Sequence, residues 1–251
     1  MKLIHNFKSP NFNKRKHNKI ELIIIHYTAL ENINESLRYL CDVKNKVSCH
    51  YLISQKGQIY NLVSEKNRAW HAGISYWNLE NDINSNSIGI ELDYSPNYQN
   101  NIFSKKLVSS LIALLKNLKK KYNIIKYNIL AHSDVSPYRK IDPGSKFPWN
   151  TLYKYNLAFN PEKIKKNKIK SIRNWFKKRN ISSKKHITLF MLAYIGYDTS
   201  LSNQKNFYYN CLLKNYQNHY LQNLQNSKNL HKTYDLIEKH FCILVLTNLK
   251  K

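Results

Sequence analysis

Two histidines in this sequence follow directly on short apolar runs, and an aspartate comes soon after the second. Residues 22–25 are apolar and precede His26, and residues 129–131 precede His132. Runs of this kind are typical of buried strands in an α/β sheet, where sites form at the carboxyl ends of strands. Together with Asp142, the two imidazoles make a three-ligand set of the kind that holds catalytic zinc and leaves a fourth position for water.

The residues after Asp142 would fix the direction of its carboxylate. Pro143 biases the backbone of Asp142 toward extended conformations, and Gly144 allows a sharp turn. Each residue also has a plainer explanation, because a histidine at a strand end is often just a hydrogen-bonded polar residue and Asp-Pro-Gly is an ordinary turn. The metal-site interpretation therefore depends on the three residues meeting in space.

Glu91 and Lys140 could act on a substrate at such a site. In a strand over residues 87–92, Glu91 shares a face with Gly89, which leaves room for a substrate or a metal-bound water. The Glu91 carboxylate could move protons, and the Lys140 ammonium could stabilise developing negative charge. The alternatives are a structural ion pair for Glu91 and a solvated surface position for Lys140.

The chain is strongly basic, with 251 residues and a formal net charge of +26. This balance favours acidic partners such as nucleic acid, anionic lipid or a carboxylate-rich polymer. Lys, Asn, Ile and Tyr are all read from A/T-rich codons, however, and genome composition is the preferred explanation of the charge. Because no zinc-finger, RRM or KH signature is present, we expect no nucleic-acid partner.

The four cysteines and the apolar runs bear on location. No cysteine lies in a C-x-x-C pair, which favours free thiols, and adjacent side chains of a strand face opposite ways, which disfavours a Cys49–His50 dyad. No run is long enough for a transmembrane helix, and residues 1–19 lack the apolar core of a signal peptide. We therefore expect a cytoplasmic protein.

The hydrophobic pattern predicts an α/β domain followed by a helical one. Strands are expected over residues 21–26, 48–53, 58–63 and 87–92 and again before His132, with a hairpin turn at Gly57. A short helix begins at Asn34 or Ser36, and a longer one is capped by Ser104. After Trp149 the pattern predicts helices over 170–178, 185–194, 207–220 and 233–246.

The predicted organisation has three parts and a linker. Residues 1–19 are a basic lead-in, and residues 20–155 form a catalytic domain with a mixed β-sheet flanked by helices and a zinc site at the strand ends. A linker at about 156–167 leads to a small all-α domain at 168–251.

Several motifs occur in a characteristic order: His26-Tyr27-Thr28-Ala29, Val47-Ser48-Cys49-His50-Tyr51, Ala69-Trp70-His71-Ala72-Gly73, Ser87-Ile88-Gly89-Ile90-Glu91, Ala131-His132-Ser133-Asp134 and Arg139-Lys140-Ile141-Asp142-Pro143-Gly144. Over residues 20 to about 152 this order resembles the zinc-dependent N-acetylmuramoyl-L-alanine amidases of the amidase-2 family. That family is related to phage T7 lysozyme and the peptidoglycan recognition proteins. The enterobacterial amidase D type is the most similar.

The resemblance implies a role for each matching residue. It places one Zn²⁺ on His26, His132 and Asp142, makes Glu91 the catalytic acid/base, and assigns Lys140 to the oxyanion of the tetrahedral intermediate. Four more residues match the family outside the ligand set, either behind the ligands or along the substrate groove: His50, Trp70, His71 and Trp77.

The activity implied is hydrolysis of the amide between N-acetylmuramic acid and L-alanine, in cell-wall degradation or murein recycling. The expected partner is peptidoglycan or a muropeptide, and the chain is expected to be a monomer. Residues 185–250 resemble a peptidoglycan-binding-like domain, which the chain could carry in degenerate form. The alternatives are a non-catalytic peptidoglycan-binding protein of the same fold and a place in the cell envelope or periplasm, like exported lipoprotein relatives.

Overall fold

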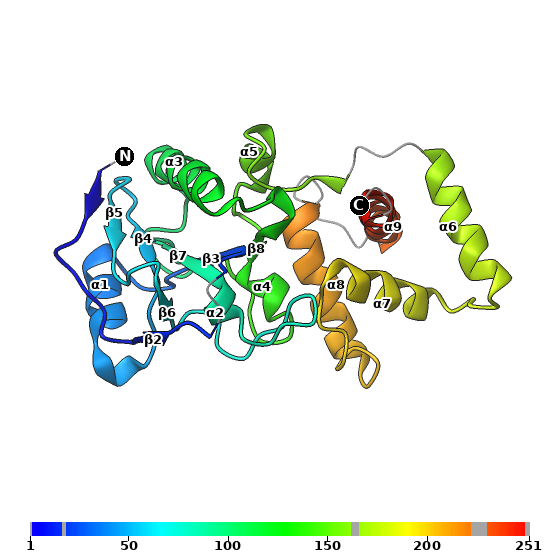
Figure 1. Cartoon of the computed structure of the whole chain (residues 1–251), viewed down its shortest axis with the longest axis horizontal. Helices are drawn as coiled ribbons and strands as arrows, with labels where there is room; N and C mark the ends of the chain where they lie inside the picture. Colours follow the sequence, from blue (N-terminus) through cyan, green and yellow to red (C-terminus); the bar gives the residue numbers. More distant parts are fainter. Residues whose placement is uncertain (1, 17–18, 162–165, 222–229, 249–251) are drawn as a thin grey trace.

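A six-stranded sheet forms the centre of the first two thirds of the chain (Figure 1). The computed structural model describes residues 2–16, 19–161, 166–221 and 230–248. The strands follow the order β1-β5-β4-β7-β3-β8 across the sheet. Their bounds in that order are Leu3–Ile4, Ile59–Asn61, Tyr51–Ile53, Ser87–Leu92, Leu22–Tyr27 and Ile129–Ala131.

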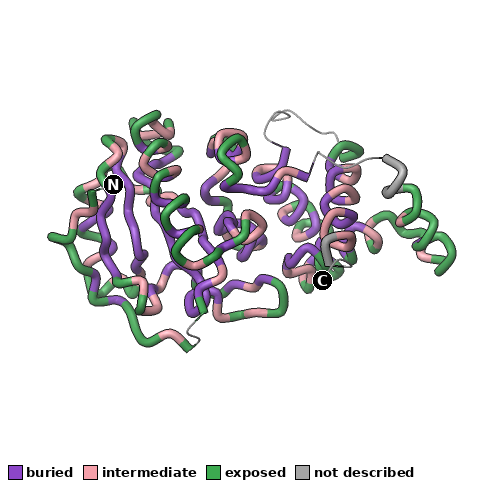
Figure 2. Tube along the Cα trace, turned by 45° about the horizontal axis from the view of Figure 1, so that its top comes forward, coloured by how far each residue is buried: buried purple, intermediate pink, exposed green. Residues whose placement is uncertain are grey.

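All neighbouring strands run parallel except β4 and β5, which form the predicted hairpin. The two longest strands, β3 and β7, lie side by side near the middle and are buried along almost their whole length (Figure 2). A strand that is buried on both faces has an almost continuous apolar sequence, so the apolar residues 22–25 allowed this strand to be predicted. The predicted α/β class with a mixed sheet is confirmed.

One face of the sheet is covered by α3, Lys105–Tyr122. Its apolar stripe packs against Ile23 and Ile25 of β3. The helix begins where the sequence predicted, because the Ser104 hydroxyl accepts a hydrogen bond from the Leu107 amide at 3.1 Å. The opposite face is covered by α1, Ile33–Cys41, at the β4–β5 end. The short helices α2, Ile83–Asn86, and α4, His132–Val135, lie further along on that side (Figure 1).

The C-terminal helices share an apolar core with that second face. Leu22, Ile24 and Leu130 belong to the same buried cluster as side chains of α7, α8 and α9. The bounds of the C-terminal helices match the predicted ones to within a few residues: α6 Lys166–Lys178, α7 Lys184–Ile195, α8 Asn206–Tyr220 and α9 Leu230–Asn248. The helix α5, Trp149–Lys154, precedes them.

The expected linker at 156–167 is packed where the structure describes it. Leu157 and Ala158 are buried with α3, and Phe159 is buried with the C-terminal helices. Residues 162–165 lie outside the described residues. The helical part is therefore continuous with the core of the sheet rather than tethered to it.

The N-terminal segment contains two strands that the sequence did not predict. The first is β1, and the second is β2, Phe12–Lys14, which pairs antiparallel with β6, Asn67–Ala69. Both are only two or three residues long, too short to carry an alternating pattern. The expected lead-in at 1–19 thus adds strands to both sheets, with residues 1, 17 and 18 outside the described part.

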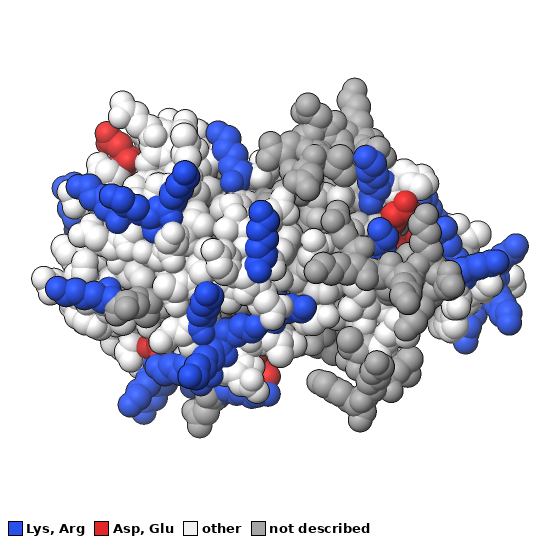
Figure 3. Space-filling view, turned by 90° about the horizontal axis from the view of Figure 1, so that it is seen from above, with Lys and Arg blue, Asp and Glu red and all other residues white. Residues whose placement is uncertain are grey.

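All four cysteines are free thiols, as predicted. Within the described ranges, no helix is long and apolar enough to cross a membrane. Lys and Arg side chains are spread over the face drawn in Figure 3, where acidic side chains are few.

Candidate metal centre

The side chains of His26, His132 and Asp142 converge on one point. His26 Nδ1 lies 2.9 Å from His132 Nδ1 and 3.3 Å from Asp142 Oδ2, and His132 Nδ1 lies 3.0 Å from the same oxygen. Among the described residues, this is the one group of three or more His, Cys, Asp or Glu side chains whose ligand atoms all lie within 4.8 Å of one another. The structure thus brings together the three residues that the sequence analysis grouped.

The sheet explains why they meet. His26 ends the buried part of β3, and His132 opens α4 directly after the neighbouring strand β8. The chain then returns to the site, because the Ser133 amide donates to the Asp142 carbonyl at 3.0 Å. Gly144 has a φ of +78°, a conformation that glycine adopts without strain.

The hydrogens on the two imidazoles can be assigned from their other contacts. His132 Nε2 lies 3.1 Å from the Ala72 carbonyl oxygen, which only accepts, so Nε2 carries the hydrogen. His26 Nε2 lies 3.1 Å from His71 Nδ1. The Ser87 hydroxyl donates to the Ile83 carbonyl and so accepts from His71 Nε2, which makes His71 Nδ1 an acceptor for His26 Nε2. With their hydrogens on Nε2, both Nδ1 atoms present lone pairs toward Asp142.

This donor set fits a divalent cation. Two lone-pair nitrogens and a carboxylate oxygen held about 3 Å apart repel one another unless a positive charge lies between them. Donors in a tetrahedron around zinc are roughly 3.3 Å apart, since zinc–nitrogen and zinc–oxygen bonds measure about 2.0–2.2 Å. Two imidazoles and one carboxylate also leave the fourth position of such a tetrahedron open.

His26 and Asp142 are held in the protonation states that bind metal. Burial, followed by the charge of His132, lowers the pKa of His26 to about 4. Burial alone would raise the pKa of Asp142, but His132 and His26 outweigh it and hold that pKa far below its ordinary value. A neutral imidazole and an ionised carboxylate are the forms that coordinate metals.

Glu91 lies beside the ligands on the neighbouring strand. It is the register partner of His26, so both side chains face the same side of the sheet. Burial, followed by the negative charge of Asp142, raises the pKa of Glu91 to about 8, against an opposing effect from Lys140. Its Oε2 atom is buried and has no hydrogen-bond partner. The carboxyl therefore has an oxygen free to exchange a proton.

A cavity of about 410 Å³ opens onto the cluster. Its wall includes His71, Glu91, Lys140 and the three converging residues. The rest of the lining was not predicted as part of the site. It comes mainly from the end of β3, from α1 and from the segment next to Asp142: Tyr27, Thr28, Ala29, Leu30, Tyr39, Leu40, Val47, Arg139 and Ile141. Most of these residues lie within the ordered motifs, and that position was the available signal.

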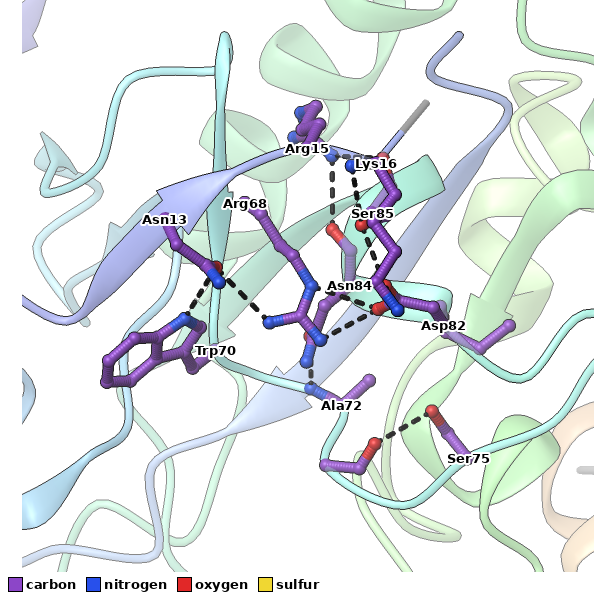
Figure 4. Close-up of polar contacts among 12 residues, drawn as sticks. Asn13, Arg15, Lys16, Arg68, Trp70, Ala72, Ser75, Asp82, Asn84 and Ser85 are labelled. Carbon is purple, nitrogen blue, oxygen red and sulfur yellow. Dashed lines mark hydrogen bonds and ion pairs between the residues drawn. The ribbon is translucent and has the colours of Figure 1, made fainter. Parts of the chain in front are cut away.

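Trp70 and Trp77, expected along the groove, lie elsewhere, and His50 takes the other of its two expected places, behind the converging residues. Trp77 is buried against Tyr197, with ring centroids 5.0 Å apart, and belongs to the core shared with the C-terminal helices. The Trp70 indole donates to Asn13 of β2 at 3.0 Å (Figure 4). His50 is fully buried and accepts from the Gly89 amide at 3.0 Å. None of the three lines the cavity.

The space above Gly89 is also used differently than expected. A Cβ atom at position 89 would lie 2.4 Å from the ring of His71. Gly89 therefore makes room for an imidazole of the protein itself, not for a substrate or a water.

Helix α8 holds the segment that carries the second histidine. Asn215 donates to the carbonyls of Pro137 and Lys140 at 2.7 and 3.0 Å. One turn further along, His219 Nδ1 lies 2.7 Å from Asp134 Oδ2, and all these side chains are buried. Asp134 also accepts from the Tyr197 hydroxyl at 2.6 Å and from the Ala131 amide at 2.7 Å. The helical region thus contacts the backbone next to His132 and Lys140.

Comparison with known proteins agrees with this site. A family model described as N-acetylmuramoyl-L-alanine amidase matches residues 16–145. The amidase AmiD of Escherichia coli is 37% identical over 158 residues, which cover 57% of this chain and 56% of AmiD. The 1,6-anhydro-N-acetylmuramyl-L-alanine amidase AmpD of Haemophilus influenzae is 35% identical over 161 residues, 57% of this chain and 86% of AmpD.

A solved structure extends the likeness into the helical region. It is the complex of E. coli AmiD with anhydro-N-acetylmuramic acid-L-Ala-D-gamma-Glu-L-Lys. The TM-score is 0.71 at 28% identity, and the match covers 91% of this chain and 89% of that one. The fold therefore matches along nearly the whole chain, whereas the sequence alignment with AmiD spans about half of the relative.

Proposed function

The chain belongs to the N-acetylmuramoyl-L-alanine amidase family, and from that membership we propose that it hydrolyses the amide between N-acetylmuramic acid and L-alanine with one zinc ion held by His26, His132 and Asp142. The observation that carries the proposal is the convergence of these side chains next to Glu91 in a single cavity. Imidazole and carboxylate ligands in this number suit a catalytic zinc.

When bound, the zinc ion would polarise the amide carbonyl and lower the pKa of water. The chain's own residues do the rest of the work. Glu91 accepts a proton from the attacking water through its unpartnered oxygen and later gives it to the leaving amine of L-alanine. The raised pKa of about 8 suits a group that must both take and return a proton near neutral pH.

Lys140 supplies positive charge close to Glu91 and His26. Its side chain lines the cavity, and its charge acts on both Glu91 and His26. An ammonium there stabilises negative charge on the carbonyl oxygen as the water adds. The turn from Ser136 fixes its backbone, since the Lys140 amide donates to the Ser136 carbonyl at 3.0 Å.

The substrate class follows from the relatives and from the cavity. The AmiD structure holds an anhydro-muramyl tripeptide, and AmpD is named for the 1,6-anhydro sugar. We propose that this chain accepts a muropeptide, with the sugar or peptide along the apolar side made by Tyr39, Leu40 and Val47. A non-catalytic role in peptidoglycan binding is less favoured, because it leaves the buried carboxyl of Glu91 without a use.

We also propose that the protein works as a monomer, since its site is built from one chain. The experiment that tests the function is digestion of a purified anhydro-muropeptide by zinc-loaded and chelator-treated protein, with products identified by mass spectrometry. Release of the free stem peptide by the loaded protein alone supports the proposal. Light scattering of the active fraction gives its mass.

A further inference from the structure

Two adjacent residues contact the outer nitrogens of both histidine ligands. His71 Nδ1 lies 3.1 Å from His26 Nε2, and the carbonyl oxygen of Ala72 lies 3.1 Å from His132 Nε2. His71 is 6% exposed and Ala72 is fully buried. A single dipeptide therefore contacts the side of each ligand imidazole that faces away from the metal.

The dipeptide is itself held by one buried side chain. Asn84 Oδ1 accepts from the amides of His71 and Ala72 at 3.0 and 2.8 Å, and Figure 4 shows Asn84 reaching toward Ala72. The Asn84 carbonyl in turn accepts from Arg15 at 3.1 Å. Arg139 donates to the Ala72 carbonyl at 2.7 Å from the other side. The position of the dipeptide is thus fixed from several directions.

Ser87, His71 and His26 form a line of hydrogen bonds, and the positions of the hydrogens follow from the contacts of Ser87. The Ser87 hydroxyl donates its one hydrogen to the Ile83 carbonyl at 2.5 Å, so toward His71 Nε2, 3.3 Å away, it can only accept. His71 Nε2 must then carry the hydrogen, which leaves Nδ1 as an acceptor. His26 Nε2 donates to that acceptor, and the lone pair of His26 Nδ1 faces the metal position.

The same order of hydrogens is required by metal binding. If His71 carried a hydrogen on Nδ1, His26 Nε2 would have to accept it and His26 Nδ1 would carry the hydrogen instead. That hydrogen would occupy the direction in which His26 coordinates. The ring of His71 can stand there only because position 89 is a glycine, since a Cβ would lie 2.4 Å from it.

We propose that His71, the Ala72 carbonyl and Asn84 form a ligand clamp, which fixes the tautomer and the ring orientation of both His26 and His132 before metal binds. His71 and Asn84 are then positioning residues, and they contribute to metal affinity rather than to the reaction itself. Hydrogen bonds to the outer nitrogen of a metal-bound histidine have this effect in general. The inference rests on the zinc site of the proposed function.

The test compares zinc affinity in variants by competition with a chromophoric chelator. His71→Leu removes the acceptor, and we expect zinc to bind about 10- to 100-fold more weakly. His71→Asn places an amide oxygen near the position of Nδ1, and we expect it to restore most of the affinity. Asn84→Ala releases both amides of the dipeptide and is expected to weaken zinc in the same direction as His71→Leu.

His240→Leu is the matched control, because His240 is also buried but bonds to Tyr216 on the C-terminal helices. It makes the same substitution away from the clamp, and zinc affinity should stay at the wild-type value. Unchanged affinity in His71→Leu, or equal weakening in His71→Leu, His71→Asn and His240→Leu, would overturn the clamp. Failure of the wild-type protein to bind zinc would instead overturn the zinc proposal on which the clamp rests.

A spectrum of the metal-free wild-type protein gives a second readout that needs no variant. Long-range proton–nitrogen correlation distinguishes the two tautomers of a neutral histidine. Without metal at His26 only the protein contacts set the tautomer of His71, and we expect its hydrogen on Nε2. A hydrogen on Nδ1 of His71 would overturn the clamp even if His71→Leu fails to fold.

Discussion

His26 on β3 and Glu91 on β7 are register partners in the parallel part of the sheet. Residues paired in this way point to the same side, so the proposed ligand histidine and the proposed acid/base are set side by side by the backbone hydrogen bonds of the sheet. Asp142 reaches the same place from a loop. The relative position of His26 and Glu91, on which the proposed chemistry depends, is therefore set by the rigid central sheet.

The proton-transfer role of Glu91 can be separated from metal binding. Glu91→Gln keeps the size of the side chain but removes the basic oxygen. We expect kcat/KM to fall by about 10²- to 10⁴-fold, the range for loss of general acid–base catalysis, with zinc content near one per chain. Stem-peptide release and metal analysis on the same preparation are the measurements. Activity close to wild type in a zinc-loaded Glu91→Gln protein would rule out this role.

Lys140 is predicted to act mainly after the substrate has bound. In Lys140→Met the ammonium is lost while the aliphatic part of the side chain is kept. We expect kcat to fall by about 10²- to 10³-fold with a smaller change in KM, because the charge develops only in the transition state. Steady-state kinetics on the muropeptide give both constants. A change confined to KM would assign Lys140 to substrate binding instead.

The sequence predicted those parts of the molecule whose pattern is local. The apolar run before His26 indicated a buried strand, and Ser104 followed by spaced leucines indicated α3. The convergence of His26 and His132 could be predicted as well, because each follows an apolar strand and the carboxyl ends of neighbouring parallel strands meet at one edge of a sheet. The C-terminal helices followed from helical spacing in the same way.

Contacts between segments far apart in the sequence could not be predicted from the sequence. Trp77 was expected in the groove but packs beside Gly196 and Tyr197, and nothing near position 77 indicates that contact. The ring of His71 lies over Gly89 because the loop between β6 and α2 packs against β7, which the local sequence does not indicate. The packing of residues 157–159 into two cores likewise needed the tertiary structure.

The raised pKa of Glu91 predicts how the stability of the metal-free protein depends on pH. Its pKa is about 8 in the folded protein, against about 4.3 in an unfolded chain. Within this window the folded state holds a proton that the unfolded state has released, so the free energy of unfolding falls as pH rises. His26, with a pKa lowered to about 4, has the opposite effect, which is largest between about pH 4 and 6.5 and fades above that.

Buried histidines with lowered pKa values contribute equally to wild type and Glu91→Gln, so the difference between these two proteins isolates Glu91. Between pH 6.5 and 8 we expect the free energy of unfolding of chelator-treated wild-type protein to fall by about 2 kcal/mol relative to that of Glu91→Gln. Urea unfolding at several pH values in this interval measures both. Equal slopes for the two proteins would contradict the assignment of the raised pKa to Glu91.

Helix α8 is predicted to stabilise the segment that contains His132. His219→Leu removes the buried imidazole that contacts Asp134, and we expect a loss of about 1–3 kcal/mol in the free energy of unfolding, the usual cost of leaving a buried polar group without a partner. The double variant His219→Leu with Asp134→Asn should recover part of the loss, because the side chain that lost its partner is replaced. Denaturant unfolding of the single and double variants gives the coupling, and strictly additive losses would argue against the pair.

The central claim is that His26, His132 and Asp142 hold a zinc ion that this chain needs to cut the amide between the muramyl group and L-alanine. The most direct measurement is mass spectrometry of an anhydro-muramyl tripeptide incubated with metal-free protein, zinc-reconstituted protein and zinc-reconstituted Asp142→Ala. We expect free tripeptide and anhydro-N-acetylmuramic acid with the reconstituted wild type alone. Equal release by the metal-free protein, or no release by a wild type shown to contain one zinc per chain, would contradict this claim.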